Sequence, residues 1–184
     1  RRAEQTGEIM VCPVINGDSI AHPEELIKEL SAVAGFKTLV LNINKEQTNV
    51  ILGGKVINIY GDGYITDELC GIKVRISPLS FYQVNHCQCE KLYSKAAEYA
   101  SLGDGFTVLD LYCGAGTIGL SMAKKAKLLI GVEIVPEAIE DAKENAALNN
   151  AENARFICAD AAEAAGELDR EGIKPDVILL DPPR

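Results

Sequence analysis

Long apolar segments are missing from this sequence of 184 residues. Because no run of about 18 apolar residues occurs, we expect no transmembrane helix and no membrane partner. The first residues, RRAEQTGEIMVC, lack the apolar core of a signal peptide. They also begin without Met, and we therefore expect a fragment of a longer chain.

Internal repeats, low-complexity tracts and a dense cysteine framework are missing too. The six cysteines are scattered along the chain, at Cys12, Cys70, Cys87, Cys89, Cys113 and Cys158. This pattern argues against a small secreted disulfide scaffold and indicates reduced thiols in a cytoplasmic protein. Cys87 and Cys89 form a C-x-C pair without further ligands, whereas a structural zinc site normally needs four, so no metal site is expected.

The charge is unevenly distributed. Residues 1–80 carry 8 Lys+Arg and 10 Asp+Glu, a net charge of −2, whereas residues 81–184 carry 10 and 17, a net charge of −7. The acidic second half argues against a broad nucleic-acid-binding surface there, although a local basic strip stays possible.

Residues 1–76 consist mostly of short extended runs. A strand is predicted at 8–15 and a helix at 23–34. Five runs rich in Val, Ile, Thr and Tyr then follow, at 37–44, 48–54, 55–61, 63–69 and 72–77. Short links between runs favour hairpins. The region is predicted to be a small α+β domain of mainly antiparallel strands with one flanking helix.

From residue 77 onward, strands and helices alternate. Helices are predicted at 86–100, 117–126, 136–149 and 161–170, and strands at 106–112, 127–133, 154–160 and 175–181. Alternation of this kind predicts a Rossmann-like α/β sheet of parallel strands, here truncated after the fourth strand. We place the domain boundary near residues 76–80, which gives domains 1–76 and 77–184.

A glycine loop follows the first strand of the second domain. Gly114, Gly116 and Gly119 have the G-x-G-x-x-G spacing, between a strand and a helix, that is typical of a nucleotide-cofactor site. Such a loop could hold the pyrophosphate of NAD or the methionine end of S-adenosylmethionine (AdoMet). Asp110 precedes it at the end of the strand. A carboxylate there would repel a pyrophosphate, but it suits the ammonium and sulfonium cations of AdoMet.

Further acidic residues end the other predicted strands. Glu133 can bind two ribose hydroxyls, a role that NAD and AdoMet sites share. Asp160 could reach an adenine amino group or cap the helix at 161–170. Asp181 closes the fourth strand, before Pro182 and Pro183. Acidic residues at the ends of all four strands favour AdoMet over NAD.

Four segments together resemble the RNA uracil-5 methyltransferases, which make 5-methyluridine in tRNA or large-subunit rRNA. They are SPLSFYQVN at 77–85, LDLYCGAGTIGL at 109–120, GVE at 131–133 and LLDPPR at 179–184. TNVILGGKVINIYGDG, at 48–63, is similar to the central domain of that family. The FYQVN element is the specific part, because other AdoMet enzymes share only the glycine loop.

The resemblance implies which residues line the AdoMet pocket, beside the loop glycines and Asp110. They are Gln83, Tyr112, Thr117, Glu133, Asp160 and Asp181. The family usually has Asn, or varies, where Asp160 stands.

The resemblance also implies a mechanism. A cysteine thiolate adds to C6 of uracil, C5 attacks the AdoMet methyl group, and a general base then removes the C5 proton. In the family, this cysteine and this base lie beyond the D-P-P-R motif, so no catalytic residue is expected within a chain that ends at Arg184. Cys113 lies beside the loop and is expected to be a small packing residue. We therefore expect a fragment that can hold the cofactor but does not methylate RNA.

Besides a non-catalytic AdoMet-binding or RNA-binding module, as which this chain itself could behave, two other functions remain open. Another AdoMet-dependent nucleic-acid methyltransferase is the first, although amino-methylating enzymes often carry an aromatic residue where Arg184 stands. An NAD-binding oxidoreductase domain is the second, and Asp110 and the DPPR ending disfavour it.

Overall fold

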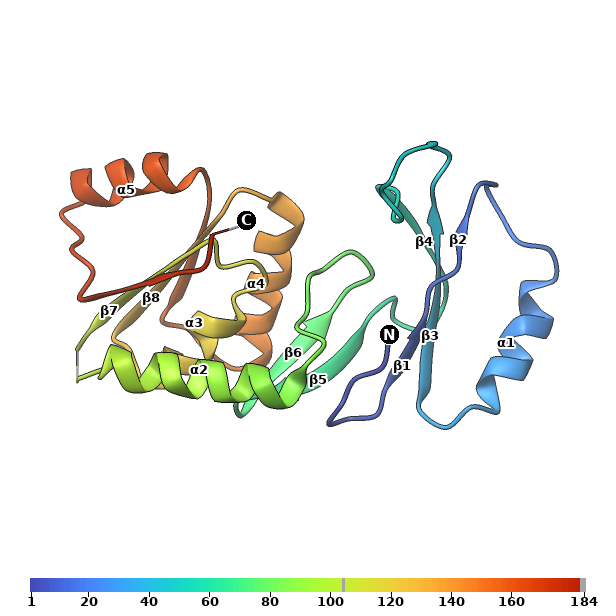
Figure 1. The fold of residues 1–184 in the computed structure, drawn as a ribbon, viewed down its shortest axis with the longest axis horizontal. Coiled ribbons are helices and arrows are strands. Elements are labelled where there is room, and N and C mark those ends of the chain that lie inside the picture. The colour runs from blue at the N-terminus through green and yellow to red at the C-terminus, as the bar shows by residue number, and fades with distance from the viewer. Residues whose placement is uncertain (104, 183–184) are drawn as a thin grey trace. The chain divides into compact units, whose positions relative to one another are not determined.

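The computed structural model describes residues 1–103 and 105–182. The chain divides into two compact units (Figure 1). The first unit comprises residues 1–67 and 75–79, and the second comprises residues 68–74 and 80–184. The hairpin of β5 and β6 therefore runs through both units, whereas the sequence prediction divides the chain near residues 76–80.

The first unit is built on β3, which is its longest strand. Its elements are β1 (Ile9–Val11), β2 (Val14–Ile15), α1 (Pro23–Ser31), β3 (Phe36–Ile43), β4 (Lys55–Tyr60), β5 (Ile65–Leu69) and β6 (Ile72–Ile76), the last two shared with the second unit. β1 and β2 pair in parallel with β3, and β4 pairs with it antiparallel. Helix α1 makes the crossover between β2 and β3, and β5 and β6 form a separate two-stranded sheet.

Three predictions for this region were wrong. Antiparallel pairing holds for β4 but not for β1 and β2, because the α1 crossover returns the chain in the same direction. The predicted strand at 8–15 is broken near Pro13, which has no N–H for a sheet ladder.

The third wrong prediction is the strand at 48–54, which is an irregular loop. The buried side chain of Asn42 donates a hydrogen bond to the carbonyl of Gly53 (2.6 Å) and accepts one from its N–H (2.7 Å). Asn44 donates to the carbonyls of Val50 and Ile51 at 2.9 and 3.0 Å. These side-chain bonds engage backbone groups that a strand would use for sheet pairing.

The second unit is a parallel sheet between helices. Its remaining elements are α2 (His86–Ala100), β7 (Thr107–Leu111), α3 (Thr117–Met122), the 3₁₀ helix η1 (Ala123–Lys125), β8 (Leu128–Glu133), α4 (Pro136–Leu148), β9 (Ala154–Cys158), α5 (Ala161–Arg170) and β10 (Val177–Leu180). The strand order is β10-β7-β8-β9, with all pairs parallel. α5 covers one face, and α2 and α3 lie on the other (Figure 1). Helices α2 and α5 begin and end where the sequence predicted them.

Side chains alternate between the two faces of this sheet. Leu109, Ile130 and Val132 pack with Ala164 and Leu168 of α5. Neighbouring positions on β7 and β8, Asp110 and Gly131, face the other side, toward the glycine loop. The carboxyl ends of all four strands therefore meet at the edge where the predicted site residues lie.

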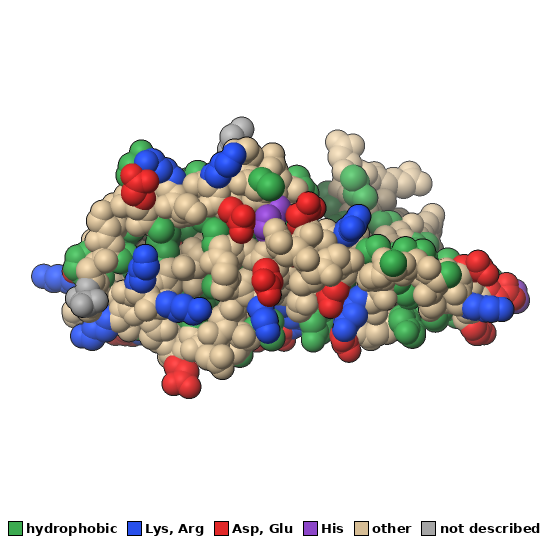
Figure 2. All heavy atoms as spheres, turned by 90° about the horizontal axis from the view of Figure 1, so that it is seen from below, with side chains coloured by type: hydrophobic (Ala, Val, Ile, Leu, Met, Phe, Trp, Pro, Cys, Tyr) green, Lys and Arg blue, Asp and Glu red, His purple; other side chains and the backbone are tan. Residues whose placement is uncertain are grey.

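The surface of the second unit carries charges of both signs. Acidic and basic side chains are interspersed on the face that Figure 2 displays. Across residues 1–103 and 105–182, the helices are too short or too polar to cross a bilayer.

Candidate cofactor site

The loop between β7 and α3 has an unusual backbone. Tyr112, Gly114 and Gly116 have φ angles of 63°, 54° and 76°. Glycine adopts this left-handed region freely, but tyrosine does so only at a cost. Tyr112 is also 38% exposed. A strained, partly exposed aromatic residue at the tip of a central strand is typical of a ligand-binding loop.

Asp110 is buried beneath this loop. Its side chain is 2% exposed, and its Oδ2 accepts a hydrogen bond of 2.9 Å from the backbone N–H of Gly119. Burial raises the pKa of Asp110 to about 7, the Gly119 bond opposes that rise, and the charge of Asp181 adds to it. The carboxyl group thus gains a proton near neutral pH unless a cation approaches it.

Glu133 bridges the glycine loop and the start of α4. Its Oε2 accepts from the N–H of Gly114 at 3.1 Å. Its Oε1 accepts from the N–H groups of Ile134 and Val135 at 2.8 and 3.0 Å. Each carboxylate oxygen can accept more than one hydrogen bond, so these contacts orient the group and leave capacity for ligand hydroxyls.

Two helices hold the glycine loop in place. From α4, the buried side chain of Asn145 donates to the carbonyl of Ala115 at 3.0 Å. From α2, the hydroxyl of Tyr93 lies 2.8 Å from that of Thr117, the first residue of α3. The loop geometry is therefore fixed by tertiary contacts as well as by its glycines.

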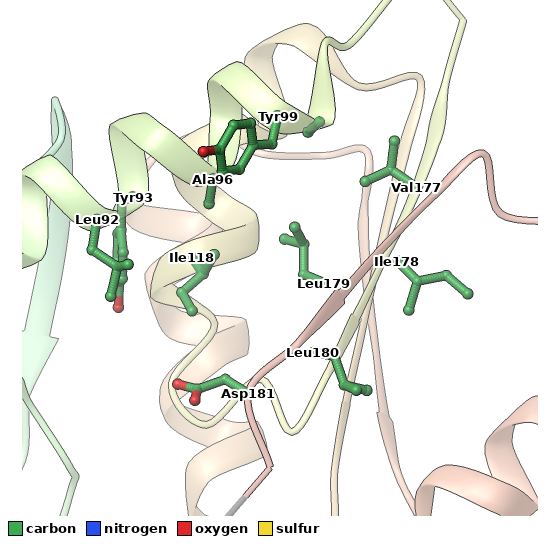
Figure 3. Close-up of a pocket in the computed structure, with 11 residues that line it drawn as sticks. Leu92, Tyr93, Ala96, Tyr99, Ile118, Val177, Ile178, Leu179, Leu180 and Asp181 are labelled. Atoms are coloured by element: carbon green, nitrogen blue, oxygen red, sulfur yellow. The ribbon is translucent and has the colours of Figure 1, made fainter.

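Asp181 follows β10 directly and lies at the same edge of the sheet. The register pairs Leu180 with Leu111, which places Asp181 beside Tyr112. Asp181 also lines a pocket of about 390 Å³ with Tyr93 and Ile118 (Figure 3). Most of the other lining side chains are apolar, from α2 and β10.

The remaining predicted residues have less definite positions. Asp160 is the N-cap of α5, and its side chain accepts from the N–H of Ala162 at 2.8 Å. The structure thus shows the capping role, and contact with adenine stays a prediction. Gln83 is half-buried in the segment before α2, and its cofactor contact also stays a prediction. Pro183 and Arg184 lie outside the described residues.

The cysteines near the site differ in exposure. Cys113 is buried against Gly131, and burial, followed by the charges of Asp110 and Glu133, raises the pKa of its thiol. It is packed as predicted. Cys158 is exposed at the end of β9, in register with Glu133. Within the described part of the chain, no group of three or more His, Cys, Asp or Glu side chains is arranged to hold a metal ion.

The site suits a cationic ligand better than an anionic one. Asp110 and Asp181 interact electrostatically, and Glu133 contacts the loop at the N–H of Gly114. This set of carboxylates would attract the ammonium and sulfonium groups of AdoMet and repel a pyrophosphate. A methyl group built on Gly114 would meet no heavy atom within 4 Å, so the loop is open on that side.

One family model matches part of the second unit. Residues 102–181 match the family described as a methyltransferase domain. With the parallel sheet described above, this match defines the second unit as a Rossmann-like methyltransferase fold. The predictions of this fold and of AdoMet as the cofactor are confirmed by this match and by the solved structure described next.

Two similar proteins are named as RNA methyltransferases, which is more specific than the family description. A protein of Caldanaerobacter subterraneus subsp. tengcongensis, named an uncharacterized RNA methyltransferase, is 48% identical over 183 residues, which cover 99% of this chain and 40% of that protein. A Clostridium acetobutylicum protein with the same description is 45% identical over 185 residues, covering 100% and 40%. The chain therefore spans about 40% of the length of these relatives.

One similar solved structure is a tRNA (uracil-54, C5)-methyltransferase of Pyrococcus abyssi in complex with S-adenosyl-L-homocysteine. It is 28% identical, with a TM-score of 0.79, and the match covers 100% of this chain and 42% of that protein.

Sequence reasoning missed two residues that shape the loop. Asn145 lies on the apolar stripe of α4, with Ile139 and Ala142, and is 0% exposed. A polar residue within an apolar stripe was the available signal. Tyr93 gave no such signal, because a tyrosine on a helix stripe is ordinary in a core and its partner, Thr117, is 24 residues away.

Proposed function

We propose that this chain is the cofactor-binding part of a cytoplasmic RNA methyltransferase that transfers a methyl group from AdoMet to C5 of uridine in rRNA or tRNA. In this proposal, residues 77–184 are the first part of the AdoMet domain and residues 1–76 are a central domain.

One observation carries the proposal. The buried Asp110, the open glycine loop and the exposed Asp181 lie together at the carboxyl edge of the sheet. A methyl donor with a sulfonium cation fits between such groups, and an acceptor base can approach from the exposed side. The names of the relatives and the uracil-specific structure of Pyrococcus abyssi support RNA and uridine as substrates.

Each residue then has a defined task. Glu133 holds the ribose hydroxyls, and its bond to Gly114 couples ribose binding to the loop. Asp110 and Asp181 stabilise the cationic part of the cofactor. When bound, AdoMet supplies an electrophilic methyl group. A nucleophilic C5 arises after a thiolate adds to C6 of the base, and the thiolate leaves again once the C5 proton has been removed.

Cys113 and Cys158, the two cysteines described above near the site, do not fit the role of that thiolate. Cys113 is buried with a raised pKa, so it is held as a neutral thiol. Cys158 lies at the far side of the sheet from Asp181, three strands away, or roughly 14 Å. We therefore propose that the 184-residue chain binds the cofactor and does not turn over.

Calorimetric titration with S-adenosylhomocysteine and, separately, with NAD tests the cofactor assignment. We expect saturable binding of S-adenosylhomocysteine alone. Binding of NAD alone would overturn the proposal in favour of an oxidoreductase. Binding of neither ligand would contradict cofactor binding by this chain.

A methyl-transfer assay tests the second part. Radiolabelled AdoMet is incubated with unmodified rRNA and tRNA, and the RNA is digested to nucleosides. We expect no 5-methyluridine from this chain. Label in 5-methyluridine would show that the chain contains its own nucleophile, and label in another nucleoside would show a different RNA methyltransferase.

A further inference from the structure

Tyr93 lies outside the predicted cofactor residues but touches one of them. Its hydroxyl oxygen is 2.8 Å from Oγ1 of Thr117, and its side chain is 4% exposed. It comes from α2, whereas Thr117 begins α3 directly after the glycine loop. Tyr93 also lines the pocket that contains Asp181 (Figure 3).

The chemistry of the two hydroxyls gives this contact a direction. A phenol is a stronger acid than an aliphatic alcohol, so the better arrangement has Tyr93 donating to Thr117. The contact between Tyr93 and Thr117 thus connects α2 to the start of α3 through side chains alone.

An accepting Thr117 has its own hydrogen left to donate. The contact with Tyr93 occupies one lone pair of Oγ1 and restricts rotation of the hydroxyl, so the hydrogen must point away from Tyr93. The carboxylates nearby, Asp110 and Asp181, suit the cationic groups of AdoMet. They leave the carboxylate at the methionine end of the cofactor in need of a donor.

We propose that Tyr93 is a positioning residue, which holds the Thr117 hydroxyl so that its hydrogen is presented to an acceptor atom at the methionine end of AdoMet. This inference rests on the proposed function, because it requires that the glycine loop binds the cofactor. Tyr93 itself does not touch the cofactor in this proposal and acts through Thr117.

A double-mutant cycle on the full 184-residue chain tests the proposal. Tyr93→Phe removes only the hydroxyl, and Thr117→Val replaces the other hydroxyl with a methyl group. S-adenosylhomocysteine affinity is measured by calorimetry for the wild type, both single variants and the double variant. We expect Tyr93→Phe to weaken binding roughly three- to tenfold, the effect of one lost hydrogen bond. We expect it to have no further effect in the Thr117→Val background.

Tyr99→Phe is the matched control. Tyr99 lies on the same helix and lines the same pocket, but it is 77% exposed and Thr117 is bonded to Tyr93 instead, so loss of the Tyr99 hydroxyl should leave affinity unchanged. Urea unfolding of each variant gives the fraction of protein that is folded under the binding conditions. If a variant is almost fully folded, its loss of affinity comes from the changed contact and not from unfolding.

Three results would overturn the inference: unchanged affinity in Tyr93→Phe, losses that add in the double variant, or a loss equal to that of Tyr99→Phe. A wild-type chain that binds no S-adenosylhomocysteine would instead contradict the proposed function.

Discussion

Asp110 and Gly119 form a contact that leaves no room for a side chain on the glycine. The Gly119 N–H donates to Oδ2 of Asp110 at 2.9 Å, and a Cβ built on Gly119 would stand 2.9 Å from the same oxygen and 2.7 Å from Cδ1 of Leu129. The third glycine of the motif is thus required for packing between α3 and the sheet, rather than for a special φ angle.

Gly119→Ala should therefore destabilise the protein. Alanine favours helices over glycine by about 1 kcal/mol, but overpacking of a buried contact typically costs about 1–3 kcal/mol. The second effect should win here, because both the carboxylate and Leu129 are buried. Urea unfolding gives the free-energy change. Gly166→Ala in α5 is the control, since a Cβ there meets nothing within 4 Å. It should stabilise the protein, and a gain at Gly119 as well would contradict the packing argument.

Asp110→Asn should change the pH dependence of stability. The pKa of Asp110 is raised from 3.8 to about 7 by burial, so the folded chain binds this proton more tightly than the unfolded chain. The stability that this proton contributes is complete below about pH 4 and is lost as the pH rises toward 7. The asparagine can still accept from Gly119, so the variant should gain stability relative to wild type between pH 5 and pH 8, by on the order of a few kcal/mol. Urea unfolding midpoints of variant and wild type at pH 5 and at pH 8 measure this difference in stability. A difference that is the same at both pH values would contradict the prediction.

Glu133→Gln should weaken cofactor binding. The NH₂ group of the new amide would replace a carboxylate oxygen that now accepts hydrogen bonds from backbone N–H groups. Two hydrogen-bond donors would then point at each other. We expect at least tenfold weaker S-adenosylhomocysteine binding by calorimetry, because the ribose acceptor and the loop contact are both disturbed. Glu140→Gln is the control, since Glu140 is exposed and contacts Lys143 at 2.7 Å. Equal losses of S-adenosylhomocysteine affinity in the two variants would contradict a role of Glu133 in cofactor binding.

Most elements of the fold could be predicted because their signals are local. The bounds of α2 and α5 follow from helix periodicity and end signals, and the glycine loop follows from its spacing. Pairing partners are not local. The parallel pairing of β1 with β3 depends on the direction of the α1 crossover, which short extended runs do not encode.

The site shows the same division. Asp110, Glu133 and Asp181 could be placed because the carboxyl ends of parallel strands meet at one edge. Asn145 and Tyr93 could not, because they reach the loop from helices 30 and 24 residues away in sequence. The spacing of residues along a chain does not predict such contacts, which arise only when helices pack on the sheet.

Two adjacent glycines in the loop at 44–54 of the first unit differ in the space that surrounds them. A Cβ on Gly53 would lie 2.0 Å from the carbonyl oxygen of Ile43, whereas a Cβ on Gly54 meets nothing within 4 Å. Gly53→Ala should therefore break the paired hydrogen bonds with Asn42 and destabilise the protein by about 1–3 kcal/mol.

Gly54→Ala should be neutral or stabilising by up to about 1 kcal/mol, because it only restricts the unfolded chain. Urea unfolding of both variants, with amide exchange at residues 42 and 53, measures the difference. Equal effects at the two positions would mean that the loop is not held by Asn42. The strand predicted at 48–54 would then have to be reconsidered, since in a strand both alanines would be tolerated alike.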